Sequence, residues 1–127
     1  ESTSGSCKAH QGRSVNNLSQ QSCSACEIGA PLVPKDQIDS LLANLDGWAV
    51  EDSSMDRLLK KYTFQSYAAA MEFTKLIADL AESEGHHPKI TLEWGLVSLE
   101  WWSHKIKGLH INDFICATKS DEIYRSL

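Results

Sequence analysis

Two short segments of alternating apolar and polar residues, separated by one glycine, constrain the fold more than any other part of the sequence. Apolar residues occupy positions 90, 92 and 94 in the first segment and 97, 99 and 101 in the second, with Gly95 between them. Alternation of this kind places the apolar side chains of a strand on one face of a sheet. The pattern predicts two antiparallel strands that form a hairpin about Gly95, with one face buried and the other in water.

The remaining elements are predicted from helical spacing, alternation and end signals. Ser66 is expected to cap a long helix, and Gly85 to end it. Asn112 is expected to cap the last helix, and the tail after Lys119 is expected to be weakly held. The other expected elements are a helix over residues 35–44, a strand over 48–51, a strand over 57–64 and the long helix over 66–84.

This order of elements predicts an α+β fold: a four-stranded antiparallel sheet with the helices packed on one face (α-β-β-α-β-β-α). The 127 residues suit one folded domain, expected over residues 31–127. A sheet covered on one side leaves edges that can pair with another copy. The sequence therefore predicts a homodimer or a homotetramer.

Residues 1–30 are rich in Ser, Gln, Asn and Gly and poor in large apolar side chains. Such a segment cannot offset its ordering entropy by burial, so we expect a disordered leader. Its serine-rich, acid-poor character is similar to the remnant of an organelle transit peptide. The expected location is therefore the cytoplasm, or an organelle matrix if the leader is such a remnant.

The cysteines leave one alternative open in this leader. The spacing of Cys7, His10, Cys23 and Cys26 is compatible with a zinc site, although no periodic flanks support it. We favour reduced, mobile thiols. Cys116 lies in an apolar run and is expected to be a buried, reduced thiol.

The charge balance excludes two classes of partner. The formal net charge is −5, which argues against direct binding to nucleic acid or to an anionic membrane surface. No apolar run approaches the roughly 20 residues that a membrane-spanning helix needs.

The candidate chemistry lies in three histidines. His86 and His87 precede Pro88, which restrains His87 to an extended backbone, and His104 follows the second strand of the predicted hairpin. A hairpin would bring both ends to the same side of the sheet, so the three imidazoles are expected to line one open rim. Imidazole is the side chain best suited to move protons near neutral pH.

Two carboxylates are placed to support these histidines. Glu82 precedes His86 by four residues and is expected to orient that ring. Asp113, in the first turn of the last helix, is expected to orient His104. A zinc site made of the three histidines is the rival interpretation, and we disfavour it because adjacent residues of an extended segment point to opposite faces.

These residues carry a resemblance to a known family. The pattern resembles the signature of the pterin-4a-carbinolamine dehydratases, and the likeness covers roughly residues 34–118. Lys105 departs from the better-known animal members, which carry an acid there. The matching positions are Glu82, His86, His87, Pro88, Trp94, His104 and Asp113.

The resemblance implies dehydration of a 4a-hydroxytetrahydropterin to quinonoid dihydropterin, in pterin cofactor recycling, without a metal or redox cofactor. It implies that His86 and His104 transfer protons, that His87 binds and positions the pterin, and that Asp113 orients His104. The pocket lining that it implies consists of Gly85, Pro88, Trp102, Ser103 and Lys105. Trp48 is expected either to form a wall of the pocket or to fill the core, and we favour the wall.

The same family also includes binding proteins. The animal members act as a dimerisation cofactor for a homeodomain transcription factor, and relatives in photosynthetic cells act as Rubisco assembly chaperones. A chaperone-only relative would be expected to have lost some of the three histidines. This chain keeps all of them, which favours the enzyme.

Overall fold

The part of the chain that the computed structural model describes, residues 32–52 and 54–127, contains three helices and four strands in the predicted order. The leader and the possible zinc ligands lie outside these residues. In the described part no helix is long and apolar enough to span a membrane. The elements are α2 (Lys35–Leu42), β1 (Ala49–Glu51), β2 (Arg57–Thr63), α3 (Tyr67–Glu84), β3 (Lys89–Glu93), β4 (Leu96–Trp101) and α4 (Ile111–Arg125).

The strands form one antiparallel sheet in the order β1-β2-β4-β3. The predicted hairpin about Gly95 is confirmed, since Glu93 pairs with Leu96. Trp94 was expected inside the strand, but it lies in the two-residue turn beside Gly95 and is 72% exposed. Gly95 has φ +70°, a left-handed conformation that a side chain disfavours. The need for a turn thus ends the alternation at Glu93.

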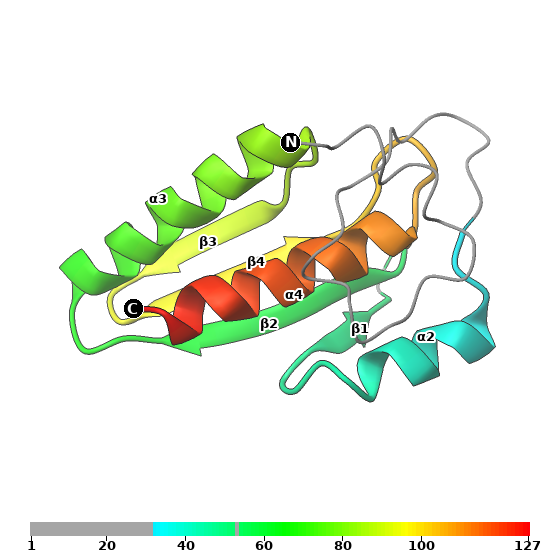
Figure 1. The fold of residues 1–127 in the computed structure, drawn as a ribbon, viewed down its shortest axis with the longest axis horizontal. Helices are drawn as coiled ribbons and strands as arrows, with labels where there is room; N and C mark the ends of the chain where they lie inside the picture. Colours follow the sequence, from blue (N-terminus) through cyan, green and yellow to red (C-terminus); the bar gives the residue numbers. More distant parts are fainter. Residues whose placement is uncertain (1–31, 53) are drawn as a thin grey trace.

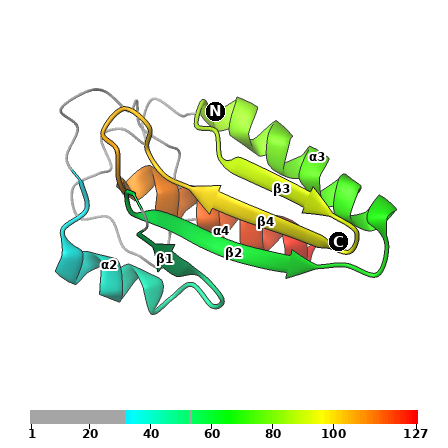
Figure 2. The same cartoon turned by 180° about the vertical axis from the view of Figure 1, so that it is seen from behind.

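The helices and the sheet form two layers. Helices α3 and α4 cover one face of the sheet (Figure 1), and the view from behind shows strands β2, β3 and β4 with no helix in front of them (Figure 2). Helix α2 lies beside β1 and adds Ile38 and Leu41 to the core. The alternating apolar residues of the central strands, including Leu58 and Leu99, are fully buried beneath the helices. The predicted α+β architecture is confirmed.

Helix α3 has the predicted ends. The Ser66 side chain accepts a hydrogen bond from the backbone N–H of Ala69 at 3.1 Å. Gly85 closes the helix with φ +66°, and its N–H bonds to the carbonyl of Ala81. Because Gly85 turns the chain out of the helix, the residues that follow it no longer keep helical spacing with Glu82.

Helix α4 differs from the prediction at both ends. Its cap is His110 rather than Asn112: Nδ1 of His110 accepts from the N–H of Asn112 at 3.1 Å, and the Asp113 side chain bonds back to the N–H of His110. The helix continues to Arg125, so the expectation of a weakly held tail after Lys119 was wrong. The composition of the tail does not reveal the tertiary partners that hold it.

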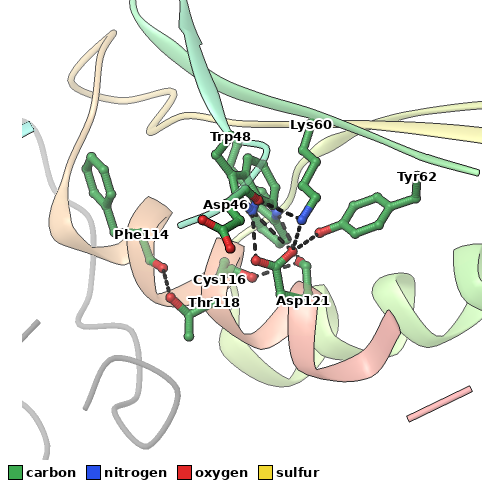
Figure 3. A network of polar contacts seen from close by, with 10 residues as sticks. Asp46, Trp48, Lys60, Tyr62, Phe114, Cys116, Thr118 and Asp121 are labelled. Atoms are coloured by element: carbon green, nitrogen blue, oxygen red, sulfur yellow. Dashed lines mark hydrogen bonds and ion pairs between the residues drawn. The ribbon is translucent and has the colours of Figure 1, made fainter. Parts of the chain in front are cut away.

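A buried polar network around Asp121 holds this last part of α4 against the sheet (Figure 3). The Asp121 carboxylate accepts from the Tyr62 hydroxyl at 2.6 Å, from Lys60 at 2.8 Å and from the Trp48 indole N–H at 3.1 Å. Asp121 is only 6% exposed, and each bond reaches a residue in or beside strands β1 and β2. Burial of the Tyr62 hydroxyl, reinforced by its hydrogen bond to Asp121, raises the pKa of that phenol above its ordinary value.

Candidate functional site

The predicted site residues meet at the end of the sheet where β3 begins and β4 ends. Lys89 pairs with Glu100, so the segment before β3 and the segment after β4 leave the sheet together. The start of α4 lies at the same end (Figure 1). The hairpin thus brings His86 and His87 to the same end as His104, as expected.

Asp113 is the centre of the polar contacts at this end. Its carboxylate is fully buried, and Oδ1 lies 2.6 Å from Nε2 of His86. Oδ2 accepts from the Ser103 hydroxyl and from the backbone N–H of His110, both at 2.9 Å. Three donors, one from the segment before β3 and two from the connection between β4 and α4, compensate for the burial of the carboxylate and fix its orientation. Asp113 therefore fixes the orientation of the His86 ring.

His86 is almost enclosed. Its ring is stacked on Trp101, with 5.6 Å between centroids and an interplanar angle of 18°, and the residue is 6% exposed. An ionised carboxylate can only accept, so Nε2 of His86 donates to Asp113 and Nδ1 is the second nitrogen of the ring. The expectation that His86 lies in a rim open to solvent was wrong, because Asp113 and Trp101 hold the ring on the helix side of the sheet.

The two carboxylate–histidine pairings differ from the expected ones. Asp113 contacts His86 rather than His104, and Oε2 of Glu82 lies 2.8 Å from Nε2 of His87 rather than at His86. The left-handed Gly85 explains the second difference, because it redirects the chain before the fourth position after Glu82 is reached. Spacing along a helix predicts a contact only while the helix continues.

His87 and His104 are the exposed members of the group. The side chains of His87 and Glu82 are 59% and 79% exposed, so their ion pair is a surface contact that contributes little to the stability of the fold. Nε2 of His104 lies 3.3 Å from the carbonyl oxygen of His87, which can only accept. The His104 ring also packs on Trp102, with 4.4 Å between centroids. Both rings are open to an approaching molecule.

The other predicted site residues fall into two groups. Gly85, Pro88, Ser103 and Lys105 lie in the two segments that carry the histidines. Trp48 does not join them: its ring contacts are with Tyr62 and Lys60, and its N–H bonds to Asp121. Trp48 is 7% exposed, which fits the alternative that it fills the core rather than a pocket wall.

Two residues of the site were missed in the sequence. His110 caps α4 and donates its backbone N–H to Asp113, and Trp101 supports the His86 ring. The capping box was readable as a polar residue at 110 followed by an acid three positions later. The contact of Trp101 with His86 had no comparable signal, because it joins residues of different segments.

This arrangement suits proton transfer. The contacts of His86 and His104 both engage Nε2, so each neutral ring keeps a basic Nδ1. A buried carboxylate that orients one imidazole is a recurring feature of acid–base sites. Within residues 32–52 and 54–127, no group of three or more His, Cys, Asp and Glu side chains is arranged to hold a metal ion.

Comparison with known proteins identifies a family whose sequences this chain matches. Residues 31–123 match the family described as pterin 4 alpha carbinolamine dehydratase. A relative from Saccharophagus degradans is 43% identical over 111 residues, which cover 87% of this chain and 98% of the relative. One from Marinobacter nauticus is 48% identical over 112 residues, covering 87% and 100%. Both are named "Putative pterin-4-alpha-carbinolamine dehydratase".

Two solved structures share the fold. A transcriptional coactivator/pterin dehydratase from Brucella melitensis superposes with a TM-score of 0.69 at 22% identity, covering 73% of this chain and 98% of the other. A pterin dehydratase-like protein identified as a RuBisCO assembly factor in the alpha-carboxysome gives a TM-score of 0.53 at 24% identity, covering 61% and 88%. At these identities the similarity establishes the fold alone.

Proposed function

The chain belongs to the pterin 4 alpha carbinolamine dehydratase family, and from this premise we propose that it dehydrates a 4a-hydroxytetrahydropterin to the quinonoid dihydropterin in pterin cofactor recycling. The observation that carries the proposal is the buried pair of His86 and Asp113, 2.6 Å apart, at the same end of the sheet as the exposed His104. Bacterial relatives give no support to the organelle-matrix location.

The reaction requires two proton movements. The bond between C4a and the hydroxyl oxygen breaks, and the oxygen leaves as water after it receives a proton. The neighbouring ring nitrogen loses a proton, and its electrons form the new double bond to C4a. No electrons are exchanged with another molecule, so general acid–base catalysis by imidazole is sufficient chemistry.

We assign the two proton movements to His86 and His104. In each ring Nε2 is engaged with an acceptor, which leaves Nδ1 to exchange a proton with the pterin. Asp113 orients the His86 ring, in place of the role toward His104 that the sequence suggested. The exposed His87 binds and positions the pterin ring, and Lys105, next to His104 in the segment after β4, forms part of the pocket lining.

A stopped-flow assay with chemically generated 4a-hydroxytetrahydropterin tests the proposal. The wild-type chain is expected to accelerate quinonoid dihydropterin formation well above the buffer rate. The variant with both His86→Ala and His104→Ala is expected to return the rate close to that of buffer, and Lys61→Ala, which alters an exposed strand residue away from the site, should retain the wild-type rate. Wild-type protein that gives no acceleration would leave the non-catalytic binding role as the better account.

A further inference from the structure

Two consecutive tryptophans at the end of β4 each support one of the two histidines. Trp101 is fully buried and stacks on His86. Trp102 lies half-buried, and its ring packs on His104 at 4.4 Å with an interplanar angle of 35°. Trp101 is the last residue of β4 and Trp102 follows it directly, so the two supports are neighbours in the chain. Asp113 also holds His86, whereas no Asp or Glu within residues 32–52 and 54–127 bonds to His104.

The His104 ring therefore depends on few contacts. It lies just after β4 in a turn that a bridge between Ser103 and Gly108 closes. Its hydrogen bond to the His87 carbonyl oxygen is long, at 3.3 Å. An exposed imidazole on such a turn has several rotamers available. The face of Trp102, which packs on the ring, restricts them.

Trp102 is itself held by Arg57. The guanidinium carbon lies 5.2 Å from the centroid of the Trp102 ring, within the range of a cation–π contact. The sheet register explains this placement: Leu58 pairs with Trp101, so Arg57 stands opposite Trp102 on the face that none of the described helices covers. A planar guanidinium suits this role because it stacks on an aromatic face while its N–H groups bond elsewhere.

Two glutamates fix Arg57 in turn. Its guanidinium lies 2.7 Å from Glu51 on β1 and 3.3 Å from Glu100 on β4. The side chains of Arg57 and Glu100 are 17% and 13% exposed, so their ion pair is shielded from solvent more than an ordinary surface pair, whereas Glu51 is 36% exposed. A continuous series of contacts therefore connects β1, β2 and β4 with His104 through Arg57 and Trp102.

We propose that Trp102 is a positioning residue for His104 and that Arg57 locks Trp102 in that position. The inference rests on the proposed function, because it assigns these residues to the orientation of one proton-transferring ring. The uncovered face of the sheet then takes part in the site, through a rigid connection that ends at His104. The expected consequence is an effect on turnover rather than on pterin affinity.

The test uses the full chain with Trp102→Ala, Trp102→Phe and Arg57→Gln, and with Lys61→Gln as the control for loss of a cation from the same strand. We expect Trp102→Ala to lower kcat roughly 10- to 100-fold, since misplacement of a reacting group by about 1 Å costs on that order, with KM nearly unchanged. Trp102→Phe should restore most of the turnover. Arg57→Gln should lower kcat by a smaller factor, and Lys61→Gln should leave it unchanged.

A second readout does not depend on activity. The Trp102 ring current shifts the NMR signals of the His104 ring protons, and we expect Trp102→Ala and Arg57→Gln, but not Lys61→Gln, to move these signals toward values for a free imidazole. Unchanged signals in Trp102→Ala would overturn the proposal even if the chain proved not to be a dehydratase. Normal kcat in Trp102→Ala beside an impaired His104→Ala would overturn it as well. Inactive wild-type protein with shifted signals would refute the dehydratase while leaving the positioning intact.

Discussion

At the scale of the residue, His86 and His104 carry the same ring in opposite environments. His86 is 6% exposed and bonded to a buried carboxylate, whereas His104 is exposed. If both transfer protons, His86→Ala and His104→Ala should each lower turnover by a factor on the order of 10²–10⁴. Only His86→Ala should also lower the free energy of unfolding, by about 1–3 kcal/mol, because it removes the buried donor to Oδ1 of Asp113. Stopped-flow rates and denaturant unfolding measure the two effects.

These two substitutions also test whether the histidines act together. The double variant should be only mildly slower than the slower single variant, because groups that act as a unit are not additive. If both single variants keep near-normal turnover and remain folded, the histidines do not perform the chemistry.

Asp113→Asn keeps His86 in place but weakens the contact that orients its ring. The amide keeps the size of the carboxylate, and its oxygen can accept from only some of the three donors that converge on this site. We expect turnover between that of the wild type and that of His86→Ala, with the effect on kcat rather than KM. Steady-state kinetics of Asp113→Asn beside Asp79→Asn, an exposed aspartate of α3, measures it. Wild-type kcat would show that Asp113 serves the helix cap alone.

His87→Ala is expected to act on binding. The His87 side chain is 59% exposed, and its partner Glu82 is 79% exposed, so little stability depends on the pair. If His87 positions the pterin, the substitution should raise KM several-fold while kcat changes less. Glu82→Gln is the matched control, because it removes the ion pair and keeps the imidazole. A fall in kcat as large as that of His86→Ala would place His87 among the proton-transferring residues.

At the scale of the element, Asp121 anchors α4 to the sheet, and Tyr62 gives this anchor a pH dependence. Burial and the bond to Asp121 raise the pKa of Tyr62 in the folded state, so the folded chain keeps the phenol proton where the unfolded chain loses it. The stabilisation is complete below the unfolded pKa of about 10 and is lost as the pH rises above it, by up to about 1.4 kcal/mol per pH unit. Denaturant unfolding between pH 9 and 11 should show this loss.

Tyr62→Phe should remove this part of the alkaline loss of stability, while Tyr67→Phe, a change at a 47% exposed tyrosine of α3, should not. Comparing the two variants cancels the contribution of other groups that titrate at high pH. Equal slopes for Tyr62→Phe and the wild type would contradict the assignment.

At the scale of the whole molecule, the sheet face that the described helices leave open and the edge strands β1 and β3 favour self-association. Backbone N–H and C=O groups on the outer side of an edge strand have no partner within the sheet and can pair with a second copy. We expect a dimer, or a tetramer made of two dimers. Sedimentation equilibrium at micromolar concentration measures the mass, and a monomer there would contradict the prediction.

The alternation about Gly95 and the caps at Ser66 and Gly85 were sufficient to derive the sheet hairpin and the long helix. These features are local: a strand shows its buried face by period two, and a helix shows its ends by capping residues. From them it also followed that His86, His87 and His104 lie at one end of the sheet. The sequence alone therefore determined the fold class, the order of elements and the place of the site.

Only the tertiary structure decided which residues touch. In the structure Asp113 contacts His86, and Glu82 contacts His87. Trp48 is buried against Asp121, which holds the end of α4 on the sheet. Each of these contacts depends on how two separately formed elements are rotated against each other, and a left-handed residue such as Gly85 changes that rotation within one step. The periodicity of the sequence does not predict these rotations, because they are set when the helices pack on the sheet.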